Sequence, residues 1–222
     1  MRLVLTPVAA ALTLLAMALV PTTAHAQERD PVLFVHGYSG DAGNWDSMIS
    51  DFIADGWQAQ DLHPITYDYN ASNVETAELI ADEVDAVLAD PAHDKVDIVA
   101  HSMGSLSSRW YVKFLGGQDH VDNWISLAGP NEGSIVELPC VQTEPSCQEV
   151  VVGSSFLSQL NSGDPTPGDV TYTTFRSLCD FIVRPSSNVT LSGADNRYAG
   201  CVGHISFLND DGVSAEVRDI LS

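Results

Sequence analysis

Short runs of apolar, β-branched residues alternate along the chain with longer segments in which apolar residues recur at helical spacing. The short runs predict buried strands over 30–35, 65–67, 96–101, 121–128, 170–175 and 188–191. The helical periodicity predicts helices over 44–53, 73–88, 105–115, 154–160 and 214–221, with Asn73 capping the second. Strands that alternate with helices favour a mostly parallel sheet covered on both faces. The pattern therefore predicts a single α/β domain.

The first 26 residues have the features of a secretory signal peptide. A positively charged start, Met1-Arg2, precedes an apolar run over 8–20 and the small-residue cleavage site Ala24-His25-Ala26. The alternative is an uncleaved membrane anchor, for which this apolar run is short. Cleavage after Ala26 leaves residues 27–222, in which no apolar run is long enough to span a bilayer. We therefore expect a secreted, extracellular protein with one domain over 27–222.

Acidic residues dominate the charge of the chain. The formal net charge is −21, and loss of the signal segment with its single arginine leaves −22. Such a surface repels phosphate backbones and anionic lipid headgroups, which argues against nucleic acid as a partner. The acidic residues are scattered and form no recognisable loop of metal ligands, so we expect neither a metal nor another cofactor. We expect a monomer that contacts a lipid interface only transiently.

The most informative stretch is Val96-Asp97-Ile98-Val99-Ala100-His101-Ser102-Met103-Gly104. A β-branched run leads into a serine flanked by small residues, and a helical segment follows at once. This order is typical of a nucleophile elbow, a strained strand-to-helix turn that holds a serine Oγ above a parallel sheet. The usual pattern is Gly-x-Ser-x-Gly; Ala100 replaces the first glycine, and its methyl group still fits. The alternative is a buried strand followed by an ordinary helix N-cap.

A serine nucleophile needs a base that accepts its proton and a carboxylate that orients the base. After such an elbow the acid comes first along the chain and the histidine last. Two histidines follow Ser102. His120 precedes a predicted strand and so belongs to the wrong edge of the sheet, whereas His204 follows the strand predicted over 188–191, at the edge where catalytic groups gather. His204 is the candidate base; a surface loop histidine is the alternative.

The loop after the strand predicted over 170–175 supplies the candidate acid, Asp180. Its apolar neighbours suit a carboxylate held away from bulk water. Asp164 and Asp169 precede that strand, at its amino end. Asp195, in the longer loop before His204, is the second choice.

The developing oxyanion needs two preorganised N–H donors. One is the amide of the residue after the serine, Met103. The candidate for the other is the amide of Tyr38, in the loop Val35-His36-Gly37-Tyr38 that follows the first predicted strand. We interpret His36 as a packed, hydrogen-bonded loop histidine and His101 as part of the packing of the elbow, rather than as catalytic groups.

Together these motifs resemble the small secreted bacterial lipases, the class 2 or lipase A-like α/β-hydrolases. The resemblance covers about 31–208 and rests on Val35-His36-Gly37, Ala100-His101-Ser102-Met103-Gly104, Cys179-Asp180-Phe181-Ile182-Val183 and Gly203-His204-Ile205. It implies a minimal α/β-hydrolase fold of about six strands, with helices on both faces and no lid domain. It also implies hydrolysis of carboxylic esters, with Ser102 as nucleophile, Asp180 as acid, His204 as base, and Tyr38 and Met103 as oxyanion amides.

Four cysteines, Cys140, Cys147, Cys179 and Cys201, indicate two disulfides in an exported chain. They include no tight Cys-x-x-Cys pair of the kind that binds zinc, and their number alone allows three pairings. If Asp180 contacts His204 as the resemblance implies, Cys179 and Cys201 come within bridging range, which pairs Cys140 with Cys147. The segment over 132–152 is the part that the resemblance constrains least.

The leading hypothesis is a secreted triacylglycerol lipase that works through an acyl-enzyme. A short-chain esterase, a polyester or cutin hydrolase, and an acyltransferase are alternatives that use the same triad. An inactive hydrolase scaffold that only binds a ligand is the alternative from another class.

Overall fold

A computed structural model describes residues 29–136 and 139–222. The signal peptide expected over 1–26 and its cleavage site lie outside the described residues. Within the described residues, no helix combines the length and the apolar character that crossing a bilayer requires.

A single sheet of parallel strands organises the molecule, in the order β2-β1-β3-β4-β5-β6. The strands are β1 (Val32–Val35), β2 (Leu62–Pro64), β3 (Val96–His101), β4 (Val121–Leu127), β5 (Thr171–Arg176) and β6 (Asp195–Tyr198). Every residue of β3 is buried. This mostly apolar strand lies between β1 and β4, where both faces of the sheet are covered.

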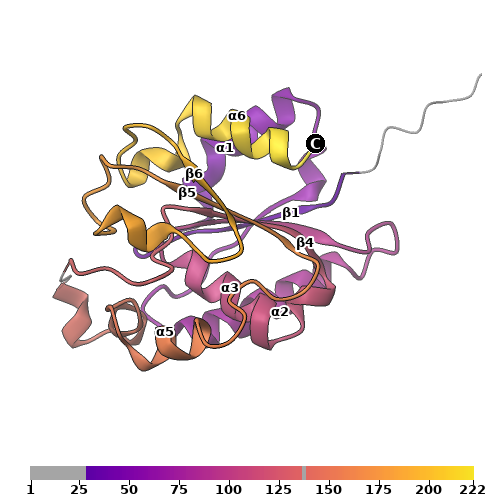
Figure 1. Cartoon of the computed structure of the whole chain (residues 1–222). Helices are drawn as coiled ribbons and strands as arrows, with labels where there is room; N and C mark the ends of the chain where they lie inside the picture. Colours follow the sequence, from indigo (N-terminus) through magenta and orange to yellow (C-terminus); the bar gives the residue numbers. More distant parts are fainter. Residues whose placement is uncertain (1–28, 137–138) are drawn as a thin grey trace, which may run out of the picture.

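Helices cover the two faces of this sheet (Figure 1). The helices α1 (Asp46–Ala54) and α6 (Asp211–Ile220) lie on one face, and α2 (Asn73–Val87), α3 (Gly104–Phe114) and α5 (Ser155–Leu160) lie on the other. A short helix, α4 (Pro145–Glu149), precedes α5. The short 3-10 helices are η1 (Ala42–Trp45), η2 (Ala59–Asp61), η3 (Gly117–Asp119), η4 (Pro139–Gln142), η5 (Ser186–Val189) and η6 (Ile205–Leu208). The structure thus confirms the expected α/β-hydrolase architecture.

Alternate residues of each strand enter the two apolar cores because successive strand side chains point to opposite faces. In β1, Leu33 and Val35 join the core beneath α2 and α3, while Val32 and Phe34 join the core beneath α1 and α6. Trp124 of β4 belongs to the first core. Burial on both faces leaves only the loops at the strand ends accessible for chemistry.

Two strand predictions and one cap prediction are wrong. The edge strand β2 ends at Pro64, before the predicted segment 65–67, and beyond it the N–H of Ile65 still donates to the oxygen of Phe34 in β1 at 3.1 Å. Proline is tolerated on such an edge strand. Segment 188–191 is not a strand but overlaps η5, and the last strand is the polar, largely exposed β6. Ser72, rather than Asn73, caps α2 by accepting a hydrogen bond from the N–H of Val74.

Candidate active site

The turn between β3 and α3 places Ser102 at the carboxyl edge of the sheet. Ser102 adopts a left-handed backbone conformation with φ of 52°, which is strained for a residue with a side chain. A Cβ on Gly104 would lie 2.3 Å from the carbonyl oxygen of His36, so glycine is required there. Ala100 is fully buried, and its methyl group is accommodated. The local geometry is that of a nucleophile elbow.

Ser102, His204 and Asp180 form a continuous chain of hydrogen bonds. The Nδ1 of His204 lies 2.8 Å from Asp180 Oδ2, and its Nε2 lies 2.8 Å from Ser102 Oγ. Because a carboxylate only accepts, Nδ1 carries the proton and Nε2 is free to accept the proton of Ser102. Asp180 and His204 are 1% and 9% exposed. The arrangement can deprotonate Ser102 in a site largely removed from water.

Asp180 is held as a carboxylate by its surroundings. Burial by itself acts to raise the pKa of Asp180, but the hydrogen bond from His204, its electrostatic interaction with that ring and two backbone N–H groups together hold the pKa below its ordinary value. The two backbone N–H groups, those of Ile182 and Val183, stabilise the charge by donating to Oδ1 at 2.8 and 3.1 Å. The anionic form needed to orient the imidazole is therefore favoured.

A disulfide between Cys179 and Cys201, 22 residues apart, joins the loop of Asp180 to the loop of His204. We call it the acid–base bridge. Ser177 reinforces it: its Oγ accepts hydrogen bonds from the N–H groups of Cys179 and Val202, at 3.0 and 2.9 Å, and donates to the oxygen of Gly200 at 2.9 Å. Nothing in the sequence singles out Ser177 from other loop serines.

Tyr38 and Met103, whose amides are the candidate oxyanion donors, both line the cavity beside Ser102. Among the described residues, neither the N–H of Tyr38 nor that of Met103 has a hydrogen-bond acceptor. Backbone N–H groups without a partner are rare away from water, and such groups are ready to bind an acceptor atom of a ligand. Both amides are therefore available to a negatively charged oxygen.

The loop that carries Tyr38 is fixed by aromatic packing. His36 Nδ1 lies 2.8 Å from the oxygen of Gly37, and the His36 ring stacks on Tyr67 at a centroid distance of 4.0 Å. The Tyr67 hydroxyl donates to the oxygen of His36. Tyr69 packs edge-on against Tyr38, with ring centroids 5.1 Å apart. His36 thus supports the loop and makes no hydrogen bond to the triad.

An apolar cavity of about 210 Å³ opens beside Ser102. Its walls include Pro130, Val136, Val150, Ile182 and Ile205, and among the residues that the structure describes no Asp, Glu, Lys or Arg side chain lines it. Next to it, Phe181 is 72% and Ile135 is 67% exposed. The cavity favours an uncharged, apolar group attached to whatever reacts at Ser102.

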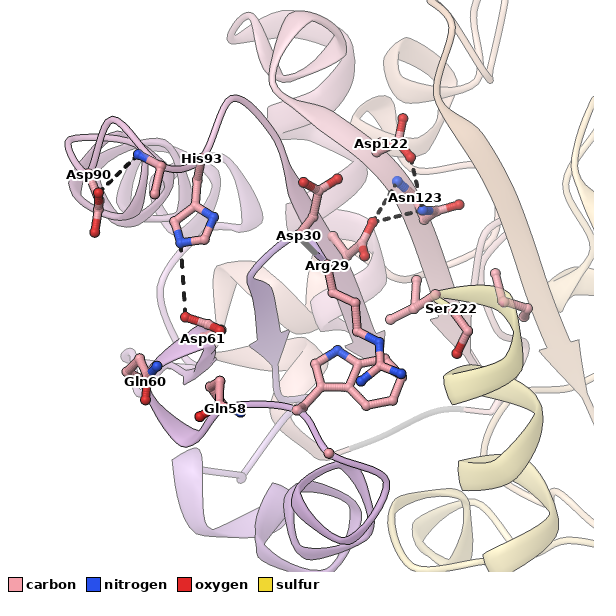
Figure 2. A pocket seen from close by; sticks show the side chains of 16 residues that line it. Arg29, Asp30, Gln58, Gln60, Asp61, Asp90, His93, Asp122, Asn123 and Ser222 are labelled. Carbon is pink, nitrogen blue, oxygen red and sulfur yellow. Dashed lines mark hydrogen bonds and ion pairs between the residues drawn. The ribbon is translucent and has the colours of Figure 1, made fainter. Parts of the chain in front are cut away.

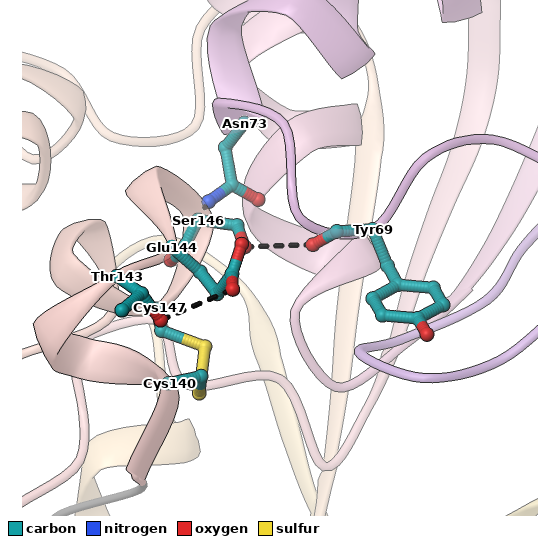
Figure 3. Close-up of a disulfide and its surroundings, with 7 residues drawn as sticks. All are labelled: Tyr69, Asn73, Cys140, Thr143, Glu144, Ser146 and Cys147. Atoms are coloured by element: carbon teal, nitrogen blue, oxygen red, sulfur yellow. Dashed lines mark hydrogen bonds between the residues drawn. A yellow bond between two sulfur atoms is a disulfide. The ribbon is translucent and has the colours of Figure 1, made fainter.

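A second disulfide, Cys140–Cys147, stabilises the segment that contributes Val136 and Val150 to this cavity; we call it the cavity-wall bridge (Figure 3). Beside it, Ser146 Oγ donates to the oxygen of Tyr69 at 2.7 Å, as Figure 3 shows. Glu149 accepts hydrogen bonds from Ser72 Oγ and the Asn73 N–H, at 2.6 and 2.7 Å, which attaches α4 to the start of α2. Both disulfides are the pairs expected from the sequence.

The competing sequence candidates lie away from Ser102. Asp195 begins β6, is exposed at the amino end of that strand and pairs with Arg197 at 2.8 Å. His120 is exposed immediately before β4, at the opposite edge of the sheet. Neither contacts the triad.

A larger cavity, of about 870 Å³, lies at the amino edge of the sheet and is lined by Asp30, Asp122 and Asn123, among others (Figure 2). Asp30, Asp97 and Asp122 have carboxylate oxygens within 4.8 Å of one another, and among the described residues they are the only acidic, histidine or cysteine side chains grouped closely enough to hold a metal ion. Burial raises the pKa of Asp97 to about 8, so a proton relieves the repulsion within this group. The cluster lies at the other edge of the sheet from the triad.

Comparison with known proteins identifies related sequences and folds. Residues 29–198 match the family model described as Lipase (class 2). The fold is similar to lipase B of Aspergillus fumigatus, with a TM-score of 0.76 and 21% identity over 87% of this chain and 52% of that one. It is also similar to the mature lipase BlEst2 of Bacillus licheniformis, with a TM-score of 0.74 and 16% identity over 87% of this chain and 92% of that one. The present chain thus spans about half the length of the Aspergillus protein.

Proposed function

The chain belongs to the class 2 lipase family, whose members are serine ester hydrolases, and we propose that it hydrolyses carboxylic esters with apolar acyl chains, most notably triacylglycerols, through Ser102, His204 and Asp180. The observation that carries the proposal is the pair of 2.8 Å hydrogen bonds that join these three side chains beside a mostly apolar cavity.

The reaction proceeds in two halves. Ser102 Oγ attacks the ester carbonyl carbon while His204 Nε2 takes its proton, and the amides of Tyr38 and Met103 bind the resulting oxyanion. The intermediate collapses to an acyl-enzyme, and the alcohol leaves with the proton from His204. Water then attacks the acyl-enzyme with the same base, releasing the carboxylic acid and restoring Ser102. Asp180 stays ionised throughout and stabilises the imidazolium.

The cavity supports an apolar acyl chain as the group bound beside Ser102. Its volume of about 210 Å³ is below the roughly 300–1,000 Å³ of pockets that enclose a drug-sized ligand. A long acyl chain would therefore continue across the exposed side chains of Phe181 and Ile205. Release of this apolar surface from water contributes to binding at about 25 cal/mol per Å².

Export from the cell is part of the proposal. The two disulfides support it because such bonds persist in oxidising compartments. The signal-like segment over 1–26 supports it independently.

Labelling with an active-site phosphonate tests the triad. We expect one phosphonyl group on the Ser102 peptide of the wild-type protein and none on Ser102→Ala, which should also lose ester hydrolysis by about 10⁴-fold or more. A folded wild-type protein that is neither labelled nor active would instead be a binding scaffold. More than a tenth of wild-type turnover in Ser102→Ala would refute the nucleophile.

A profile of acyl-chain length then tests the substrate class. Hydrolysis of emulsified triacylglycerols and of long-chain nitrophenyl esters is expected. Activity confined to acetyl esters would replace the lipase proposal by a short-chain esterase.

A further inference from the structure

His101 is the last residue of β3 and directly precedes Ser102, yet it makes no hydrogen bond to either triad partner's side chain. It is 3% exposed, and its Nε2 lies 2.9 Å from the main-chain oxygen of His204. The two imidazole rings are 4.9 Å apart between centroids. His101 therefore connects the elbow to the loop that carries the base, across 103 positions of sequence.

The protonation state of His101 follows from this contact. A carbonyl oxygen only accepts, so Nε2 carries a proton and donates it. Burial, together with the nearby His204, lowers the pKa of His101 to about 3, so its ring is neutral near pH 7 and Nδ1 has no proton. The ring is thus a permanent donor to the His204 main chain, and its one N–H proton is engaged in that hydrogen bond.

The His101 ring also has little room to turn. A Cβ on Gly37 would lie 3.3 Å from its Nδ1 and 2.8 Å from Ser102 Cβ, so the loop over 35–38, which we call the oxyanion loop, packs directly against both residues. The elbow, the oxyanion loop and the His204 loop meet at this imidazole. A displacement of the ring would be passed to the loop that places the base.

We propose that His101 is a positioning residue, whose Nε2–H holds the main chain of His204 so that the His204 ring reaches Ser102 and Asp180 at the same time. Asp180 fixes one end of that ring, and His101 fixes the backbone from which the ring extends. The inference rests on the proposed function, because the position of His204 matters for turnover only if His204 is the base.

Two variants of equal length separate the hydrogen bond from packing. In His101→Gln the terminal amide places an N–H close to the position of Nε2, whereas His101→Met fills the same space without a donor. His101→Met should lower kcat by about 10- to 100-fold with KM changed less than about twofold, since a displaced base costs turnover rather than substrate binding. His101→Gln should recover most of the lost kcat.

Thermal unfolding and a third variant, His101→Asn, complete the test. The shorter amide of His101→Asn ends near Nδ1 and cannot reach the His204 oxygen, so it should behave like His101→Met; this comparison decides the matter if His101→Met does not fold. Equal kcat values for the Gln variant and the two others, at similar unfolding temperatures, would overturn the role of His101. Inactive, unlabelled wild-type protein would overturn the proposed function instead.

Discussion

Replacement of Asp180 by asparagine tests the triad at the position where the sequence offered a competitor. In the structure, Oδ1 accepts hydrogen bonds from the N–H groups of Ile182 and Val183, and Oδ2 accepts one from His204 Nδ1. Two N–H donors require an oxygen opposite them. The amide of Asp180→Asn should therefore keep its oxygen on those donors and turn its NH₂ group toward His204.

The reversed contact changes the tautomer of His204. An NH₂ group needs an acceptor, so Nδ1 gives up its proton and Nε2 carries it instead. Nε2 can then no longer take the proton of Ser102. A wrong tautomer in a Ser-His-Asp site costs about 10⁴-fold in kcat, equivalent to about 5 kcal/mol of transition-state stabilisation. We expect a loss of that order in Asp180→Asn.

The variant also alters the pH dependence of stability. The pKa of Asp180 is held below its ordinary value, so the carboxylate stabilises the native state above the unfolded pKa, and this contribution is lost as pH falls through the native pKa. Asp180→Asn should therefore be less stable than wild type near neutral pH, and the difference should shrink in acid.

The assay is steady-state hydrolysis of a soluble nitrophenyl ester, with circular dichroism and thermal unfolding as controls for folding. Asp195→Asn is the matched control because Asp195 is exposed and pairs only with Arg197 among the described residues. It should retain nearly full kcat. If Asp195→Asn proved the more damaging change in folded protein, or if Asp180→Asn kept more than a tenth of wild-type kcat, the assignment of the acid would be refuted.

Three other predictions concern the bridges, the cavity and the amino edge. Changing both cysteines of the acid–base bridge to serine should lower activity at temperatures where circular dichroism still reports a folded sheet, and by more than loss of the cavity-wall bridge does. The bridge adds about 3 kcal/mol at most to the free energy of unfolding through chain entropy. Peptide mapping that showed crossed cysteine pairs would contradict this reasoning. Val150→Phe should lower kcat/KM for long-chain relative to acetyl esters by about tenfold or more, while Val152→Phe, at a position 46% exposed, should leave the acyl profile unchanged. The raised pKa of Asp97, about 8, means that the free energy of unfolding falls as pH rises from about 4 to about 8, because the native carboxyl keeps its proton while the unfolded chain loses it. Asp97→Asn should remove this part of the pH dependence in urea unfolding, and identical pH profiles for variant and wild type would count against it.

Local sequence was sufficient to predict the elbow. The requirement for small residues around Ser102 acts over five consecutive positions, and the fully buried β3 appears as a β-branched run because both faces of the sheet are covered. The order of Ser102, Asp180 and His204 along the chain was predicted in the same way, although the strand that precedes His204 is β6 and not the segment predicted over 188–191. The fold class followed from the same alternation of strands and helices.

The end of the sheet was not readable in this way. The edge strand β6, Asp195–Tyr198, is polar and largely exposed, so it has no apolar pattern, while the apolar Val189 and Leu191 are buried in a non-strand segment. The sequence therefore left Asp195 as a competitor of Asp180. Only the pairing of β6 with β5 assigns Asp195 to the amino end of a strand, at the wrong edge for contact with His204.

The supports of the triad were also beyond the sequence. Ser177 and His101 each bind main-chain atoms of a loop 23 or more residues away, and a hydrogen bond to a backbone atom imposes no recognisable residue type on its partner. Side-chain spacing along one strand or helix is a local property that the sequence by itself determines. Which loops meet at the carboxyl edge of the sheet, and which polar side chains join them, is decided only when the strands pair, because those contacts depend on the register of residues distant in the chain.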